Sequence, residues 1–107
     1  MASLQIIGQP PKVIHTYQVI RIGSDENDKT LTYCIEDKSV DKLHATLTRY
    51  EKGLYLVNES RHGSVTLNGR KVGGPVHITY RDTYHGCCRL HFGHVEALLL
   101  VSGSLNG

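Results

Sequence analysis

The stretch "SVTLNGRKV", from Ser64 to Val72, carries the clearest fold signal in the sequence. Asn and Gly both tolerate the positive φ that a two-residue hairpin turn requires, so Asn68-Gly69 is a strong turn signal. The flanking segments, Ser64–Leu67 and Arg70–Val72, then form the two arms of a hairpin. The sequence therefore predicts antiparallel β-structure here.

Similar short segments extend from this hairpin toward both ends of the chain. Turn residues separate them, and no window of helical length has an apolar period of 3.6 residues. The clearest alternation runs from Leu43 to Tyr50, with Ala45 and Leu47 on one face and His44 on the other. The other predicted segments are Leu4–Ile7, Lys12–Ile22, Leu31–Ile35, Leu54–Val57, Val76–Tyr80, Cys88–Phe92 and Val95–Val101. About ten short strands in a chain of 107 residues predict an all-β sandwich.

Length and composition limit the classes of function. A chain of 107 residues suits one domain with a single core, and 39% hydrophobic and 21% charged residues are ordinary for a soluble globular protein. A formal net charge of +2 without a Lys/Arg cluster predicts no direct nucleic-acid binding. The longest apolar run, Ala97–Val101, is too short to span a bilayer, so we expect no membrane contact.

The ends of the chain and the cysteines suggest where the domain works. The start of the chain lacks the charged and apolar regions of a signal peptide. Three cysteines, with Cys87 and Cys88 adjacent, are a poor disulfide framework and predict reduced thiols in an intracellular compartment. We expect the domain to cover residues 1–103, with 104–107 as a tail or the beginning of a linker.

Residues of catalytic type occur without a catalytic signature. His44, with Asp41 nearby and serines in several loops, supplies the residue types of a triad. No serine lies in a nucleophile elbow, however. We therefore expect no enzyme, no catalytic residue and no small-molecule substrate.

A metal site is a further alternative. The segment "HGCCRLHFGH", from His85 to His94, is rich in ligand types. Adjacent cysteines on a strand point to opposite faces, so at most one could join a given site. We expect no metal and no cofactor, and a small metal-binding domain built on Cys87, Cys88, His91 and His94 remains the less favoured possibility.

Three segments lie at successive strand–loop boundaries: "RIGSDEND" (Arg21–Asp28), "SVDKLHATL" (Ser39–Leu47) and "NESRHGSVTLNGRKV" (Asn58–Val72). With the later "LHFG" (Leu90–Gly93), this ordered set resembles the forkhead-associated (FHA) domain. That family has a strand ending in Gly-Arg, then Ser-Arg-x-His-Ala, then Ser-x-Asn-Gly-Thr leading into a Val-Asn-Gly hairpin. The resemblance covers Leu4 to Val101. It implies a β-sandwich of about eleven short, mostly antiparallel strands whose loops at one end bind phosphothreonine.

The residues that shape the family's binding loops are kept. Gly23 matches the glycine that ends the strand, and His44 matches the histidine that is buried behind the loop. Gly63 matches the glycine of the Ser-x-Asn-Gly-Thr frame, and Asn68-Gly69 matches the hairpin. The resemblance implies structural roles for His44, Gly63 and Gly69.

The residues that hold the phosphopeptide in the family are mostly replaced. Ser24 stands at the arginine position, Asp41 at the serine position and His62 at the asparagine position. A charge-assisted hydrogen bond to phosphate contributes roughly 1.5–3 kcal/mol, so loss of the arginine alone weakens binding about ten- to a hundredfold. The predicted degenerate phosphopeptide-binding face comprises Gly23, Ser24, Asp41, Lys42, Arg61, His62 and Asn68.

Two interpretations of this face follow. The first is a module that has lost phosphothreonine binding, since Asp41 would repel a phosphate and the loop that follows Gly23 is acidic. The alternative is a weak phosphothreonine-peptide reader that uses Lys42, Arg61 and His62.

The terminal strands suggest another contact. The segment "ALLLV" (Ala97–Val101) is apolar on both faces, and the first strand is nearly so. The resemblance places these strands close together, which predicts an exposed apolar patch and a two-fold self-association surface, unless a loop of the same chain covers it. The candidate dimer surface comprises Leu4, Ile6, Ile7, Leu98, Leu99 and Leu100.

The position of the domain suggests a cellular setting. FHA domains at an extreme N-terminus resemble those of DNA-damage mediator proteins of the mediator of DNA damage checkpoint type, in which the domain can join two copies of the chain. This resemblance implies a homodimer within a nuclear scaffold, with other nuclear proteins as possible partners.

Overall fold

The computed structural model describes residues 1–102. The predicted boundary at 103 and the tail at 104–107 lie outside the described residues. Within residues 1–102 the chain forms eleven strands and one short 3-10 helix, η1 (Tyr80–Asp82). The strands are β1 (Ala2–Ile6), β2 (Lys12–Ile14), β3 (Val19–Gly23), β4 (Tyr33–Cys34), β5 (Ala45–Tyr50), β6 (Gly53–Asn58), β7 (Val65–Leu67), β8 (Arg70–Lys71), β9 (Val76–Ile78), β10 (Cys87–Phe92) and β11 (Val95–Val101).

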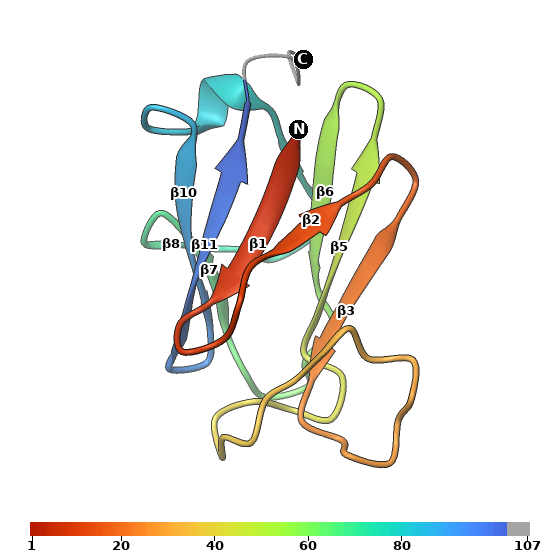
Figure 1. Cartoon of the computed structure of the whole chain (residues 1–107). Helices are drawn as coiled ribbons and strands as arrows, with labels where there is room; N and C mark the ends of the chain where they lie inside the picture. The colour runs from red at the N-terminus through yellow and green to blue at the C-terminus, as the bar shows by residue number, and fades with distance from the viewer. Residues whose placement is uncertain (103–107) are drawn as a thin grey trace.

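The strands form two sheets that pack face to face (Figure 1). The six-stranded sheet has the order β2-β1-β11-β10-β7-β8, and the five-stranded sheet has the order β4-β3-β5-β6-β9. Every pairing between named strands is antiparallel except that of β3 with β4. The predicted all-β sandwich is confirmed. No helix within residues 1–102 has the length and apolar character needed to cross a membrane.

The predicted hairpin is present. Asn68 has φ 50° and Gly69 has φ 85°, and Leu67 pairs with Arg70 across the turn. By contrast, the predicted strand Lys12–Ile22 is split into β2 and β3 by a turn at Tyr17, where φ is 64°. The side-chain oxygen of Gln18 accepts a hydrogen bond from the backbone N–H of His15 in this turn.

The core lies between the sheets and follows the period of two along each strand. On β1, Leu4 and Ile6 are fully buried, while Gln5 between them is half-buried. Leu4 pairs with Leu99 of β11, which is also fully buried. Period-two alternation brings these paired residues to the same inner face.

The candidate dimer surface therefore needs correction. Leu4, Ile6 and Leu99 belong to the core and are not available on the surface. Ile7, beyond the end of β1, is exposed, and on β11 Leu98 is half-buried and Leu100 exposed. The sequence overestimated this patch because a run of consecutive leucines does not reveal which of them face inward.

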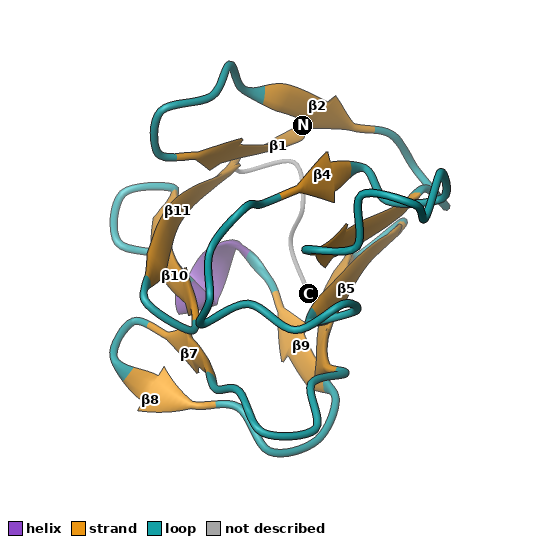
Figure 2. Ribbon diagram, turned by 90° about the horizontal axis from the view of Figure 1, so that it is seen from below, coloured by secondary structure: helices purple, strands orange, loops and turns teal. Residues whose placement is uncertain are grey.

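The loops after β3, β4 and β6 gather at the lower end of Figure 1, opposite the N-terminus, and Figure 2 looks at the molecule from that end. The turn between β10 and β11 also reaches this end, since the N–H of His94 donates to the hydroxyl of Ser39 at 2.8 Å. Segments far apart in the sequence thus meet at one end of the sandwich.

Candidate functional site

His44 holds two of these loops together from the inside. It directly precedes β5 and is fully buried, although the alternation predicted it on the outer face with Thr46. Its Nδ1 accepts a hydrogen bond from the N–H of Asp41 at 3.0 Å, and its Nε2 lies 2.8 Å from the carbonyl oxygen of Ser64. Because Nδ1 accepts, the proton sits on Nε2 and is donated to Ser64. Both ring nitrogens therefore have structural roles.

Two glycines allow the loops to approach this closely. A Cβ on Gly63 would overlap Cε1 of the His44 ring, and a Cβ on Gly23 would overlap the carbonyl oxygen of Lys42. Neither glycine is needed for a positive φ, so the requirement here is space. The chain at Gly23 is also tied to the opposite loop, because the N–H of Ser24 donates to the carbonyl oxygen of Asp41 at 3.0 Å.

The carboxylate of Asp41 joins the loop before β5 to the loop after β6 through hydrogen bonds. Its Oδ2 accepts hydrogen bonds from the backbone N–H of Arg61 at 2.8 Å and of His62 at 3.3 Å. These N–H groups, with that of His62 the larger influence, hold the pKa of the Asp41 carboxyl below its ordinary value. Asp41, which is half-buried, is therefore an internal anion in the sense that the domain itself supplies the negative charge that two backbone donors bind.

The rim around Asp41 carries charges of both signs. A hollow of about 540 Å³ is lined by Lys42, Arg61, His62, Glu59, Leu43 and Asp41 itself. Lys42 and Arg61 are exposed, and neither forms an ion pair with any residue of the range 1–102. Glu59 on the same rim offsets part of their positive charge.

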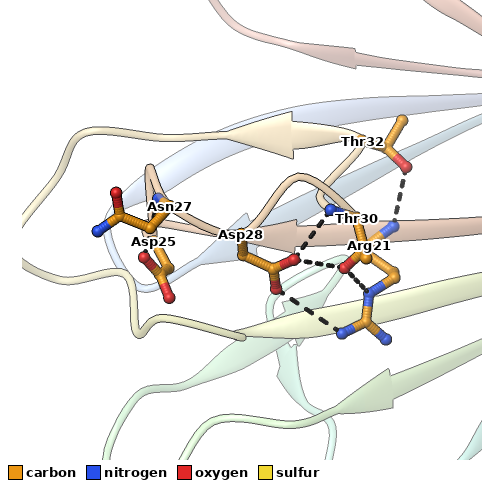
Figure 3. Close-up of polar contacts among 6 residues, drawn as sticks. All are labelled: Arg21, Asp25, Asn27, Asp28, Thr30 and Thr32. Atoms are coloured by element: carbon orange, nitrogen blue, oxygen red, sulfur yellow. Dashed lines mark hydrogen bonds and ion pairs between the residues drawn. The ribbon is translucent and has the colours of Figure 1, made fainter.

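Polar side chains of the loop between β3 and β4 form hydrogen bonds and an ion pair with one another and with Arg21 of β3 (Figure 3). Asp28 accepts hydrogen bonds from the N–H of Thr30 at 2.9 Å and from its hydroxyl at 2.6 Å, and these bonds hold the pKa of Asp28 below its ordinary value. Arg21 lies 4.0 Å from Asp28 and donates from Nε to the Thr30 hydroxyl at 3.0 Å. The arginine nearest to Ser24 in the sequence is thus directed into this loop.

Comparison with known families gives these loops a context. Residues 3–101 match the family model of the Mutator 2 fork head associated domain. The chain belongs to the FHA domain family. FHA domains are protein-interaction modules, and that level of function applies to this chain.

Solved FHA domains share its fold. The FHA domain of the CT664 protein from Chlamydia trachomatis matches with a TM-score of 0.78 at 14% identity, covering 94% of this chain and 97% of that chain. The MEK1 FHA domain in complex with the HOP1 pThr318 peptide matches with a TM-score of 0.71 at 16% identity, covering 94% and 96%. The FhaA FHA domain complexed with the intracellular domain of Rv3910 matches with a TM-score of 0.71 at 15% identity, covering 92% and 99%. A comparison with curated protein sequences finds no match.

Most of the predicted face of this FHA domain comes together. Gly23, Ser24, Asp41, Arg61 and His62 lie on loops that are joined by the hydrogen bonds described above. Lys42 lines the same hollow as Asp41.

Asn68 makes its hydrogen bonds elsewhere. Its Oδ1 accepts from the N–H of Arg89 at 2.9 Å, and its Nδ2 donates to the carbonyl oxygen of Asp82 at 3.3 Å. These partners belong to η1 and β10, so in this structure Asn68 supports the hairpin and its neighbours.

Within residues 1–102, the side chains named for the less favoured metal-binding alternative do not form a cluster. Cys88 is fully buried on the inner face of β10, and Cys87 is half-buried on the outer face. Across residues 1–102, no group of three or more His, Cys, Asp or Glu side chains is arranged to hold a metal ion. The metal-binding alternative therefore receives no support from the described residues.

Sequence reasoning treated Asp41 as a source of repulsion and missed its internal bonds. Its partners are backbone N–H groups, which every residue except proline carries, so no motif identifies them. The sequence held only an indirect signal for these bonds. Asp41 stands where the family has a phosphate-contacting serine, and a carboxylate at that position needs hydrogen-bond donors, which the backbone of the facing loop can supply.

Proposed function

We propose that this FHA domain has lost phosphothreonine binding and acts as a homodimerising interaction module within a nuclear DNA-damage-response scaffold. The observation that supports the first part most strongly is the contact of the Asp41 carboxylate with the backbone N–H groups of Arg61 and His62. An anion belonging to the domain thus already occupies backbone donors of two residues of the predicted phosphopeptide-binding face.

An incoming phosphate would meet two obstacles. It would have to displace Asp41 from its donors or lie beside a carboxylate that repels it, and Ser24 offers no charge in place of arginine. Each charge-assisted bond that is not formed costs roughly 1.5–3 kcal/mol, or about ten- to a hundredfold in affinity. Arg21 does not compensate, since Asp28 and Thr30 engage its guanidinium.

The corrected terminal-strand surface supports self-association. Ser3 of β1 pairs with Val13 of β2 and with Leu100 of β11, and Leu100 pairs with Cys87 of β10. This row crosses the outer face of the six-stranded sheet. Val13 and Leu100 are each 45% exposed, and Leu98 lies in the next row. The exposed apolar side chains of Val13 and Leu100 on this row can meet their counterparts across a two-fold axis.

The scaffold role rests on the resemblance to FHA domains of DNA-damage mediator proteins. A constitutive dimer needs no phosphate signal, and it would join two copies of whatever binding modules the scaffold carries. Joining them raises the effective concentration of the second binding event and therefore the avidity. Other nuclear proteins would then bind elsewhere on the scaffold rather than at the degenerate phosphopeptide-binding face.

Two measurements test the proposal. Calorimetry should detect no difference in affinity between a phosphothreonine peptide and its unphosphorylated form. Clear micromolar binding of the phosphorylated peptide alone would contradict the proposed loss of phosphothreonine binding. Sedimentation equilibrium should show a dimer that Leu100→Glu converts to a monomer. Val19→Glu is the matched control, because Val19 is also 45% exposed but lies on the opposite sheet. A strict monomer at high micromolar concentration would contradict the proposed dimer.

A weak phosphothreonine reader is the second candidate, favoured by Lys42 and Arg61 beside His62, which are exposed and form no ion pair among residues 1–102. In that case the phosphorylated peptide binds weakly, and replacing Lys42 and Arg61 by alanine abolishes the preference. If binding persists in that double variant, these residues do not form the site.

A further inference from the structure

Four aromatic side chains from separate segments form a continuous strip on the outer face of the five-stranded sheet. The aromatic strip consists of Tyr17, Tyr50, Tyr55 and His77. Tyr17 lies edge-to-face against Tyr50 with centroids 6.4 Å apart, and Tyr50 against Tyr55 at 5.3 Å. Tyr55 stacks on His77 at 4.7 Å with an interplanar angle of 11°. The core does not require this arrangement, since all four side chains are exposed.

Tyr17 joins the strip through an uncommon backbone conformation. Its φ of 64° lies in the left-handed region, which bulky residues rarely adopt. Its N–H donates to the carbonyl oxygen of Arg49 at 2.7 Å, and its hydroxyl donates to Oε1 of Glu51 at 3.0 Å. Tyr17 remains 65% exposed, so the fold holds a large aromatic side chain toward solvent. Strained positions of this kind often occur at functional sites.

The chemistry of the strip limits what can bind it. It contains no lysine or arginine, which disfavours a nucleic-acid backbone or a phosphopeptide. The backbone groups beneath it are used in the β5–β6 and β6–β9 ladders, so a ligand cannot add as a strand on this face. Recognition must come from ring faces, phenol hydroxyls and the carboxylate of Glu51. Oε2 of Glu51 makes no hydrogen bond or ion pair with residues 1–102.

We infer that the aromatic strip binds a proline-rich segment of a partner protein in the polyproline II conformation, with a basic residue of that segment at Glu51. A polyproline II chain has no internal hydrogen bonds, so its carbonyl oxygens are free to accept from phenol hydroxyls. Aromatic-lined surfaces recognise such segments through proline rings that pack against aromatic faces. The near-perpendicular pairs, at 78° and 83°, form corners where a proline ring contacts one ring face and one ring edge.

This surface is independent of the dimer surface. The strip lies on the five-stranded sheet, whereas Val13, Leu98 and Leu100 lie on the six-stranded sheet. Both faces can be occupied at once, and a dimer would present two strips. Peptide binding by the aromatic strip can therefore fail its test while the proposed dimer holds, and the reverse.

An NMR titration of the isotope-labelled chain tests the inference. The probes are a synthetic peptide of one arginine followed by a run of prolines, and a control in which glycine and serine replace the prolines. We expect amide shifts to cluster at Tyr50, Tyr55 and His77 with the proline peptide alone. Tyr55→Ser should weaken binding by about tenfold, the loss of roughly one good aromatic contact. Tyr84→Ser is the matched control, since Tyr84 is exposed and lies against His85, outside the strip.

Further outcomes decide between occupants. Glu51→Gln should remove the preference for the arginine-containing peptide over an all-proline peptide. Shifts that are absent at millimolar peptide, equal for the glycine-serine control or unchanged in Tyr55→Ser would overturn the inference. If Tyr55→Ser converts a dimer to a monomer in sedimentation equilibrium while Leu100→Glu does not, the strip binds a second copy of this chain, and the inference is wrong.

Discussion

The imidazole ring of His44 lies so close to Gly63 that a Cβ on residue 63 would overlap its Cε1 atom. The ring cannot move away freely, because it is fully buried and hydrogen-bonded through both nitrogens. The ring also meets Phe92 edge-to-face, with the two ring centroids 6.4 Å apart. The loops at this end of the sandwich are therefore packed around His44 and Gly63.

Gly63→Ala should destabilise the domain. The added methyl group would force His44 or the loop to shift, and overpacking of this kind costs about 1–3 kcal/mol. Urea unfolding monitored by circular dichroism measures the change. Gly73→Ala is the control, since a Cβ there meets no heavy atom within 4 Å and should alter stability little. Equal effects of the two substitutions would contradict the role given to Gly63.

Phosphothreonine binding should appear when the internal anion is removed and the missing cation is supplied. We expect the double variant Ser24→Arg with Asp41→Ser to gain at least about tenfold in affinity for a phosphothreonine peptide over its unphosphorylated form, measured by calorimetry. Ser24→Arg alone should gain less, because Asp41 still occupies the donors of Arg61 and His62. A folded double variant that binds no better than the native domain would show that more than these positions prevents binding.

Stability should fall below about pH 4, in part through Asp41. The folded state holds the pKa of Asp41 below the value of about 3.9 expected for an unfolded chain, so the native state binds fewer protons than the unfolded state. Its stabilising contribution is complete above that value and is lost as pH falls through the lowered pKa. Urea unfolding at a series of pH values should therefore show a smaller decrease for Asp41→Asn than for the native protein. An unchanged decrease would assign the acid sensitivity to other carboxyls, such as Asp28 and Asp37.

The cysteines should differ strongly in reactivity. Burial raises the pKa of Cys88 to about 11, so little thiolate forms at this inaccessible position. Cys34 is exposed. Iodoacetamide at mildly alkaline pH should modify Cys34 first and Cys88 only after denaturation, as peptide mass spectrometry can show. Rapid modification of Cys88 in the native protein would mean that β10 opens readily.

The sequence predicted local features best. The Asn68-Gly69 turn depends on the φ preferences of two residues, and the structure has that turn. Alternation along β5 placed Ala45 and Leu47 in the core for a similar local reason. His44 did not follow the alternation, because β5 begins one residue later and the preceding backbone turns the ring inward.

The sequence was less informative where several residues could fill the same role. In "ALLLV", apolarity alone does not distinguish Leu99 in the core from Leu100 on the surface. Pairing of β11 with β1 makes that distinction, since it places Leu99 opposite Leu4. The aromatic strip was not predicted, because Tyr17, Tyr50, Tyr55 and His77 lie on segments that meet only through strand pairing.

By itself, the sequence determined that the chain forms a β-sandwich of the FHA type and that the residues expected to hold a phosphate are replaced. The β-sandwich follows from turn preferences and a period of two, and the FHA type and the replaced residues follow from the resemblance of short, ordered motifs to that family; all of these are local features of the sequence. Only the tertiary structure decided that Asp41 binds the N–H groups of Arg61 and His62, twenty or so residues further along the chain. Backbone donors carry no sequence signature, so their partner becomes known only when the loops are folded against each other.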